Sequence, residues 1–218
     1  MNIPLQFNCP SCRAAWSQRV LLSAPKLDFT CAECGQTWYG IRGLDLTVGL
    51  LILARSWHEL EFEKDYDMAI VLAAAALDCE LSWLYSKWKK FEALGADTAF
   101  SPEACEEELR RMRKVADKIR EVSRMLYQGG IEQFVVDSGS WKETINGRFP
   151  GLHLGSLATD FQETVFRPRN RVLHQGKADH TRDDAAKCYS IAELGIRILK
   201  DMDKARFTQE DKDEQAHE

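Results

Sequence analysis

Four cysteines in two closely spaced pairs constrain the N-terminal part of this chain more than any other feature. Cys9 and Cys12 stand in the run CPSC, Cys31 and Cys34 stand in CAECG, and 18 residues separate the two pairs. In a reducing compartment this spacing predicts metal binding rather than disulfides. Each pair can wrap a tight turn around one side of a tetrahedral ion, and four thiolates satisfy zinc with no open position for water. We therefore expect one structural Zn²⁺ per chain and no catalytic metal.

The segment 1–43 resembles a zinc ribbon, a module in which two cysteine knuckles sit at the ends of short antiparallel strands. Leu5–Phe7 leads into the first knuckle, Leu27–Thr30 leads into the second, and Gln36–Tyr39 leaves it as a strand. So small a module buries too little apolar surface to fold alone, and the metal would supply much of its folding free energy. Zinc ribbons bind nucleic acid, bind protein or cap a neighbouring domain, and the sequence leaves these three roles open.

The rest of the chain predicts a mainly α protein, with a helical domain over 44–207. Asp65–Glu92 contains no Gly or Pro and is apolar nearly all round in its first half, which indicates a buried central helix. Apolar steps of three and four predict one continuous helix from Ser101 to Leu126, with Ser101 as its N-cap. The glycine-rich stretch 131–155 predicts a loop. Further helices are expected over 46–63, 156–166 and 184–204, although Thr47–Gly49 could equally continue a strand of the ribbon.

The negative net charge of the whole chain argues against a nucleic-acid partner. The 218 residues carry a net charge of −5, and 44% hydrophobic with 29% charged residues is typical of a soluble globular protein. However, 201–218 alone holds seven acidic against three basic residues, and we expect 208–218 to be a disordered acidic tail. No apolar run approaches the roughly 20 residues that span a bilayer, and 1–10 lacks a signal-peptide pattern. These features predict a cytoplasmic protein with no membrane partner.

Positive charge concentrates between the last two predicted helices. The run 166–182 contains five basic residues against one acid, Asp179, together with two histidines, which predicts a site for a polyanion. The alternative is a basic linker that pairs with acidic neighbouring helices. The basic residues and histidines of this run are Arg167, Arg169, Arg171, His174, Lys177, His180 and Arg182.

The order Arg169, Asn170, three residues, His174 resembles the Arg-x4-His motif of the HEPN superfamily. These small all-α domains are often metal-independent ribonucleases that act as toxins or as effectors of antiviral defence. The run ALDCEL at 76–81 is similar to the helix that carries the family's acid, with Asp78 in its place. The resemblance covers 44–207 and implies an endoribonuclease with RNA as its partner. It also implies a homodimer whose two motifs face one composite cleft.

The residues themselves suggest how such a cleft would work. RNA carries its own nucleophile, the 2′-hydroxyl, so His174 would serve as base or acid and Arg169 would stabilise charge on the phosphate. Asn170 would orient the backbone or a phosphate oxygen. Asp78 is expected on an apolar face of its helix with Arg169 as its partner. Glu80 is the competing acid, with Lys87 two turns further on as its possible partner. Arg167, Arg171, Lys177 and His180 are the expected substrate-binding residues.

Arg169 and His174 would lie about 140° apart on a regular helix, so they cannot converge on one substrate from a straight segment. Either the helix ends between them, as Pro168 and Gly176 permit, or two copies of the chain assemble the site. Gly176 also stands where related toxins carry a modifiable Tyr, so control by that modification is not supported. Any antitoxin or trigger protein stays unknown.

Two other functions compete with the nuclease. The helical domain could be a catalytically inactive HEPN-like module that binds nucleic acid or protein, or the chain could be a zinc-ribbon regulator that binds DNA. The single cysteines Cys79, Cys105 and Cys188 are interpreted as packing residues. The sequence has no phosphate-binding glycine loop and no zinc-protease motif.

Overall fold

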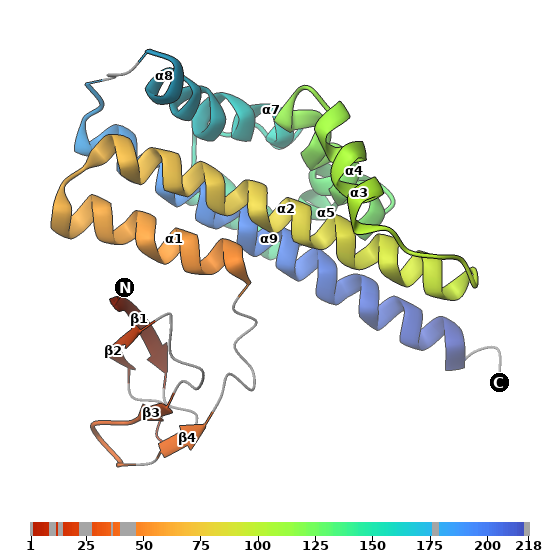
Figure 1. Ribbon diagram of the computed structural model, residues 1–218, viewed down its shortest axis with the longest axis horizontal. Coiled ribbons are helices and arrows are strands. Elements are labelled where there is room, and N and C mark those ends of the chain that lie inside the picture. Colours follow the sequence, from red (N-terminus) through yellow and green to blue (C-terminus); the bar gives the residue numbers. More distant parts are fainter. Residues whose placement is uncertain are drawn as a thin grey trace.

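The structure is a computed structural model that describes residues 2–8, 12, 15–21, 28–35, 37–39, 47–175 and 179–215. Its side chains are described for residues 12, 30–35, 47–175 and 179–208. The described chain is mainly helical, as the sequence predicts. Two β-hairpins precede a helical bundle that contains two long helices (Figure 1).

The N-terminal hairpins bracket the two cysteine pairs. Strands β1 (Asn2–Asn8) and β2 (Ala15–Leu21) pair antiparallel, with Asn8 opposite Ala15 at the end next to the first pair. Strands β3 (Asp28–Thr30) and β4 (Thr37–Tyr39) form a second, shorter antiparallel pair around Cys31–Cys34. The described cysteines Cys12, Cys31 and Cys34 therefore lie between the paired strands of the two hairpins.

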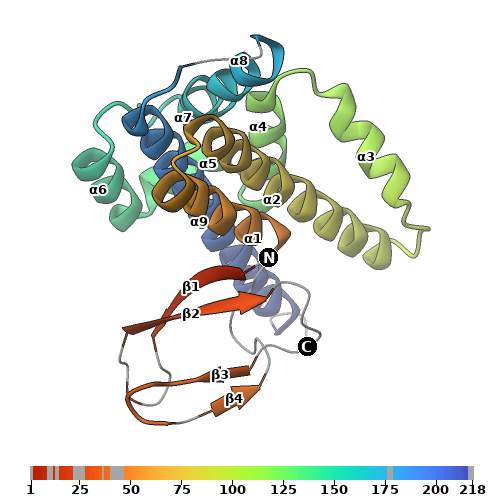
Figure 2. The same ribbon diagram turned by 60° about the vertical axis from the view of Figure 1, so that its left-hand side comes forward.

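The predicted central helix is α2 (Tyr66–Gly95), and it forms the core of the bundle. It begins at Asp65, whose carboxylate accepts a hydrogen bond of 3.0 Å from the backbone N–H of Met68. Four of its alanines, Ala69, Ala73, Ala74 and Ala76, are fully buried, because α1 (Val48–His58) and α9 (Arg182–Gln215) lie along it on different sides. Figures 1 and 2 show these three helices side by side in both views.

The remaining helices cover the other faces of α2 and α9. Two are short π-helical turns, η1 and η2, a form that is often found at functional sites. The bounds are η1 Glu59–Glu63, α3 Pro102–Arg111, α4 Val115–Leu126, α5 Gly130–Asp137, α6 Gly139–Arg148, α7 Leu157–Phe161, η2 Gln162–Phe166 and α8 Arg167–Gln175.

The helix predicted to run unbroken from Ser101 to Leu126 is wrong. Ser101 caps α3 as expected, accepting a 3.1 Å hydrogen bond from the N–H of Ala104, but the helix ends at Arg111. Met112 is extended, and α4 begins at Val115. The apolar stripe continues through the break, but α3 packs on α2 alone while α4 also packs on α5, α7 and α9. The two halves of the apolar stripe therefore require two helices that run in different directions.

The loop predicted over 131–155 is also wrong, because most of it is helical. Ile131 and Val135 bury one face of α5, and Ile145 anchors α6. Gly139 lies at the first position of its helix and Gly147 near the last, where the cost of glycine is small. The number of glycines in this stretch therefore did not reveal α5 and α6, because glycines at the ends of helices do not prevent them.

From Leu157 to Gln175 the chain is helical without interruption through α7, η2 and α8. Pro168 occupies the second position of α8 and does not end it. Arg169 and His174 therefore share one helix, which removes the possibility that the helix ends between them.

The C-terminal tail departs from expectation in the same way. Helix α9 continues to Gln215, so the backbone of 208–215 is helical where disorder was predicted. Extending an already packed helix costs no new nucleation, and Lys, Glu and Gln are good helix formers.

Among the described helices, α2 has the length and composition of a membrane span, and 56% of its apolar window is buried inside the bundle. That burial is what the core helix of a soluble protein requires.

Candidate functional site

Helix α8 carries the Arg-x4-His motif at the surface of the bundle. Arg169 is half-buried, and Asn170 and His174 are exposed one turn apart on the same face. The guanidinium of Arg169 donates a 3.4 Å hydrogen bond to the side-chain oxygen of Asn170. Leu173 is 52% exposed beside them. The helix thus presents cationic and amide groups around an apolar side chain that the described residues leave half exposed.

The acid expected to pair with Arg169 pairs elsewhere. Asp78 lies on α2 and forms an ion pair of 3.1 Å with the ammonium of Lys118 from α4. Its side chain is 36% exposed, so it is not buried in an apolar face as the sequence suggested. Within the described residues, no carboxylate forms an ion pair with Arg169. The sequence could not reveal Lys118, because it is 40 positions away on a helix whose placement depends on the fold.

Glu80, the competing acid, is fully buried and holds α1 against α2. Its carboxylate accepts a short hydrogen bond from the hydroxyl of Thr47, the N-cap of α1. The expected partner Lys87 is engaged with Asp203 at 2.7 Å instead. Gly49 permits the close approach, since a Cβ there would lie 2.7 Å from the carbonyl oxygen of Ala76. Glu80 is therefore a structural acid, not part of the α8 face.

A cavity of about 810 Å³ lies beside α8, and we call it the α8 hollow. Three of the expected substrate-binding residues, Arg167, Arg171 and His180, line it. Lys177 lies outside the described residues. The full lining is Glu163, Thr164, Arg167, Pro168, Arg171, Gln175, Asp179, His180, Asp184 and Lys187. Arg169, Asn170 and His174 are not among these residues, so the motif and the hollow occupy different faces of one helix.

Two of the charged groups at the α8 hollow already have partners. Arg167 forms an ion pair of 2.7 Å with Glu163 one turn earlier. His180 is only 11% exposed at its side chain, and its Nδ1 lies 2.7 Å from a carboxylate oxygen of Asp67 on α2. Arg171 is exposed and forms no ion pair within the described part of the chain. Arg171 is therefore the best placed of the expected residues to meet an anion in the hollow.

The wall of the hollow next to α9 is fixed by a helix cap. The backbone N–H and hydroxyl of Thr181 donate to Asp184 at 3.0 and 2.8 Å, and the N–H of Asp184 donates back to the Thr181 hydroxyl at 3.3 Å. This reciprocal capping box begins α9. These hydrogen bonds, the backbone N–H first, lower the pKa of Asp184 below its ordinary value.

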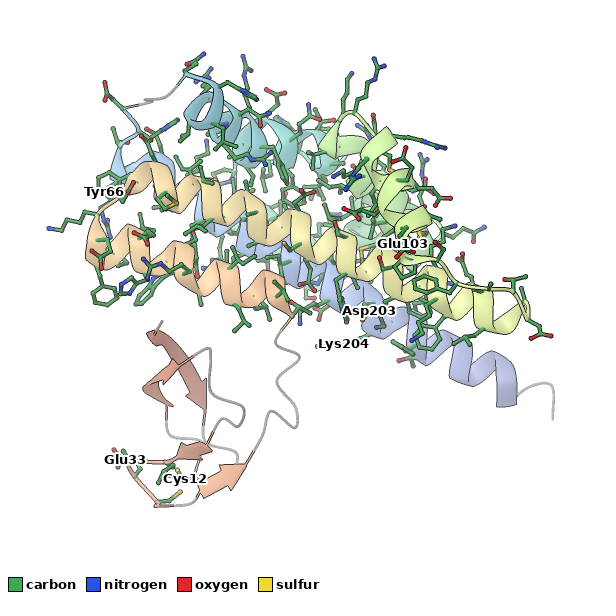
Figure 3. The ribbon with its side chains drawn as sticks, viewed as in Figure 1. Cys12, Glu33, Tyr66, Glu103, Asp203 and Lys204 are labelled. Carbon is green, nitrogen blue, oxygen red and sulfur yellow. The ribbon has the colours of Figure 1, made fainter. Side chains whose placement is uncertain are left out.

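Three of the four N-terminal cysteines come together at the ends of the hairpins. The sulfur atoms of Cys12, Cys31 and Cys34 all lie within 4.8 Å of one another, and those of Cys12 and Cys31 are 3.6 Å apart. Gly35 has a φ of +68°, and its N–H donates a 2.9 Å bond to the carbonyl of Cys31, which closes the turn. Cys9 lies outside the described residues. These three thiols could hold a metal ion, and Figure 3 shows Cys12 on the side of the hairpins away from the bundle.

The three single cysteines differ from this group. Cys105 and Cys188 are buried, and burial raises the pKa of the Cys188 thiol to about 12. Burial, followed by the charges of Asp78 and Glu80, also raises the pKa of Cys79. Thiols held in the protonated form are poor nucleophiles and poor metal ligands, in agreement with a packing role.

The α8 face and the cysteine group lie on opposite sides of α1 and α2 (Figures 1 and 2). No family model, curated protein or solved structure matches this chain. Its function must therefore be argued from the geometry of these sites.

Proposed function

We propose that this protein is a metal-independent endoribonuclease of the HEPN type, with Arg169 and His174 as its catalytic residues. The observation that supports it most is that one helix carries a half-buried Arg169 and an exposed His174, with no carboxylate in the described residues paired to Arg169. The N–H groups of such a guanidinium that do not bind Asn170 can engage a phosphate. Asn170, hydrogen-bonded to Arg169, would hold that guanidinium in place.

The reaction needs two side chains around one phosphate, a proton acceptor and a cation. His174 would accept the proton of the ribose 2′-hydroxyl, whose oxygen then attacks the adjacent phosphorus. Arg169 would stabilise the charge that develops on the phosphate oxygens. The P–O5′ bond breaks, the 5′-oxygen takes a proton from water, and the products end in a 2′,3′-cyclic phosphate and a 5′-hydroxyl. No metal takes part in this step.

A second copy of the chain would complete the site. Because α8 is unbroken, Arg169 and His174 point in directions about 140° apart, and one chain cannot aim both at one phosphate. Leu173, exposed between them, would provide an apolar contact across a two-fold axis. In such a dimer the Arg169 of one protomer faces the His174 of the other.

Cleavage of a labelled single-stranded RNA tests the proposal. Arg169→Ala and His174→Ala should each abolish cleavage. Arg111→Ala and His153→Ala, two exposed residues away from α8, should leave it unchanged. The wild type should cleave in EDTA under conditions that retain protein-bound zinc, and it should not cleave 2′-O-methyl RNA. Cleavage that disappears with free divalent metal, or that survives both α8 variants, contradicts the mechanism.

Mixing the two inactive variants tests the composite site. Random exchange makes half of the dimers mixed, and each mixed dimer has one intact Arg169–His174 pair, so the mixture should recover about a quarter of wild-type activity. A site contained within one chain would recover none.

For the N-terminal module we propose a zinc ribbon in which Cys9 is the fourth ligand, beside Cys12, Cys31 and Cys34. Thiolates are the ligands that structural zinc prefers, and the three described sulfur atoms are close enough to share one ion. Metal analysis should find one zinc per chain. Cys9→Ser and Cys31→Ser should each lower that content, and Cys105→Ser should not.

A binding module without nuclease activity is the second candidate. The ion pair between Asp78 and Lys118 favours it, because the acid that the family places beside the motif is engaged elsewhere. It predicts RNA binding that depends on α8 without any cleavage, so the same experiment separates the two.

A further inference from the structure

Two further cavities extend from the α8 hollow along α9. The central hollow, of about 420 Å³, shares Thr164 and Lys187 with the α8 hollow. The α6 hollow, also about 420 Å³, shares Arg148, Phe149 and Ser190 with the central hollow. Because neighbouring hollows share these lining residues, we consider the three together as one groove, the α9 groove. The α9 residues that line it run from Asp184 to Asp201. That span corresponds to roughly 25 Å of helix.

Four of the basic residues that line the α9 groove are open to solvent. Arg148, Arg171, Lys187 and Arg197 are exposed, and within the described residues none of the four forms an ion pair. Glu193 and Asp201 lie one turn before and one turn after Arg197 on α9. The guanidinium of Arg197 pairs with neither and lies 5.8 Å from the ring centre of Trp141.

Most of the acids in the groove are occupied. Glu163 pairs with Arg167, and Asp184 belongs to the cap of α9. Asp201 accepts a 3.2 Å hydrogen bond from the indole N–H of Trp141. Glu193 and Asp179 are the others that line it. The central hollow has no acid among its lining residues, while Arg148 and Lys187 both border it. An anion is therefore best accommodated there.

Aromatic rings stand next to this cationic position. Trp141 and Phe149 are half-buried in the wall of the α6 hollow, and the guanidinium of Arg148 lies 5.9 Å from the Phe149 ring centre. The indole N–H of Trp141 is held by Asp201, which fixes the ring. Alternating cationic groups and ring faces along a groove are how proteins hold single-stranded nucleic acid without reading its sequence.

We propose that the α9 groove binds a single RNA strand, with a phosphate between Arg148 and Lys187 and a base against Trp141. The strand continues past Arg171 toward α8. This rests on the proposed function, because it supplies the path by which a substrate reaches the α8 face. It also predicts that binding requires several linked nucleotides and that free nucleotides bind far more weakly.

Binding of a fluorescent, uncleavable 2′-O-methyl RNA, measured by anisotropy, tests the groove separately from cleavage. Trp141→Leu should weaken binding about five-fold or more, the loss of one stacked base. Arg148→Gln and Lys187→Gln should each weaken binding and reduce the slope of log K against log salt by about 0.7. Lys142→Gln is the matched control, since Lys142 is exposed on α6 and does not line the groove, and it should change binding less than two-fold. Circular dichroism confirms that each variant is folded.

Intrinsic fluorescence gives a second readout. RNA should quench part of the tryptophan emission of the wild type and a smaller part of that of Trp141→Phe. Nucleoside monophosphates are the comparison ligand. If they bind as tightly as RNA and depend on the same residues, the groove is a nucleotide pocket and the strand proposal is overturned.

The outcomes for the two proposals can be told apart. RNA binding that ignores the groove variants while the chain still cleaves RNA overturns the groove and leaves the nuclease intact. Groove-dependent binding without any cleavage overturns the nuclease and leaves the groove.

Discussion

Replacing Asp203 should reveal how the two longest helices are held together. The buried Asp203 of α9 accepts hydrogen bonds of 2.7 and 2.8 Å from the ammonium of Lys87 on α2. It accepts a third, of 2.7 Å, from the indole N–H of Trp88. Figure 3 shows Asp203 where α9 lies against α2. Asp203→Ala removes the acceptor for both groups and leaves a cation and an indole N–H unsatisfied.

The cost follows from what each group can do afterwards. Breaking a buried ion pair by removing one partner costs about 3–5 kcal/mol. The Lys87 side chain is 18% exposed and can reach water, so the lower end applies to it. We expect Asp203→Ala to lower the free energy of unfolding by about 3 kcal/mol, which in a chain of this size lowers Tm by roughly 6–12 °C. Asp203→Asn keeps an acceptor for Trp88 and should cost about half as much.

Urea unfolding followed by circular dichroism measures the effect. Asp117→Ala is the control, because Asp117 is 51% exposed in its pair with Arg120, and exposed pairs contribute about 0–1 kcal/mol. In a double-mutant cycle with Lys87→Met, the two changes should cost less together than their sum. A loss below 1 kcal/mol in Asp203→Ala, at an unchanged dependence on urea, would refute the reasoning.

Three further predictions concern single positions. Gly49→Ala should cost about 1–3 kcal/mol in urea unfolding, because its Cβ would meet a backbone carbonyl of α2, whereas Gly95→Ala, with nothing within 4 Å, should be near neutral. The Thr181 hydrogen bonds lower the pKa of Asp184, so their stabilisation is complete well above its ordinary value of 3.8 and is lost as the pH falls through the lowered pKa. The stability difference between wild type and Asp184→Asn should accordingly shrink from pH 7 to pH 3, and a constant difference would contradict this. Burial raises the pKa of Cys188 to about 12, so mass spectrometry should find it unmodified by iodoacetamide at pH 8 in the native protein and modified in urea.

Local sequence signals predicted those elements whose packing is the same along their whole length. The segment from Asp65 lacks Gly and Pro and is apolar through most of its first half, and it is one helix, as expected. The stripe from Ser101 to Leu126 satisfies the same helical period and still breaks at Met112. Periodicity reports that one face is apolar, and it does not report which neighbours cover that face. The break could be known only once α4 was placed among α5, α7 and α9.

Some features of the candidate site can be predicted from neighbouring residues in the sequence, and others depend on contacts between distant residues. The exposure of Asn170 and His174 on a basic segment follows from local sequence, as does the closeness of three of the cysteines. The partner of Asp78 does not, because Lys118 reaches it from 40 positions away. Pairings between long charged side chains depend on small shifts between helices. The spacing of residues along the sequence does not predict those shifts.

The continuity of α8 has the largest consequence for function. A helix that broke after Arg169 would let one chain direct both motif residues at one phosphate, and a monomer could then be active. In the proposed nuclease an unbroken helix would tie activity to dimer formation, so cleavage should be lost on dilution while each chain stays folded. The α9 groove is formed within a single chain, and RNA binding there should survive the same dilution. The concentration dependence of cleavage and of binding should therefore separate, and only the binding curve should remain when the chain is monomeric.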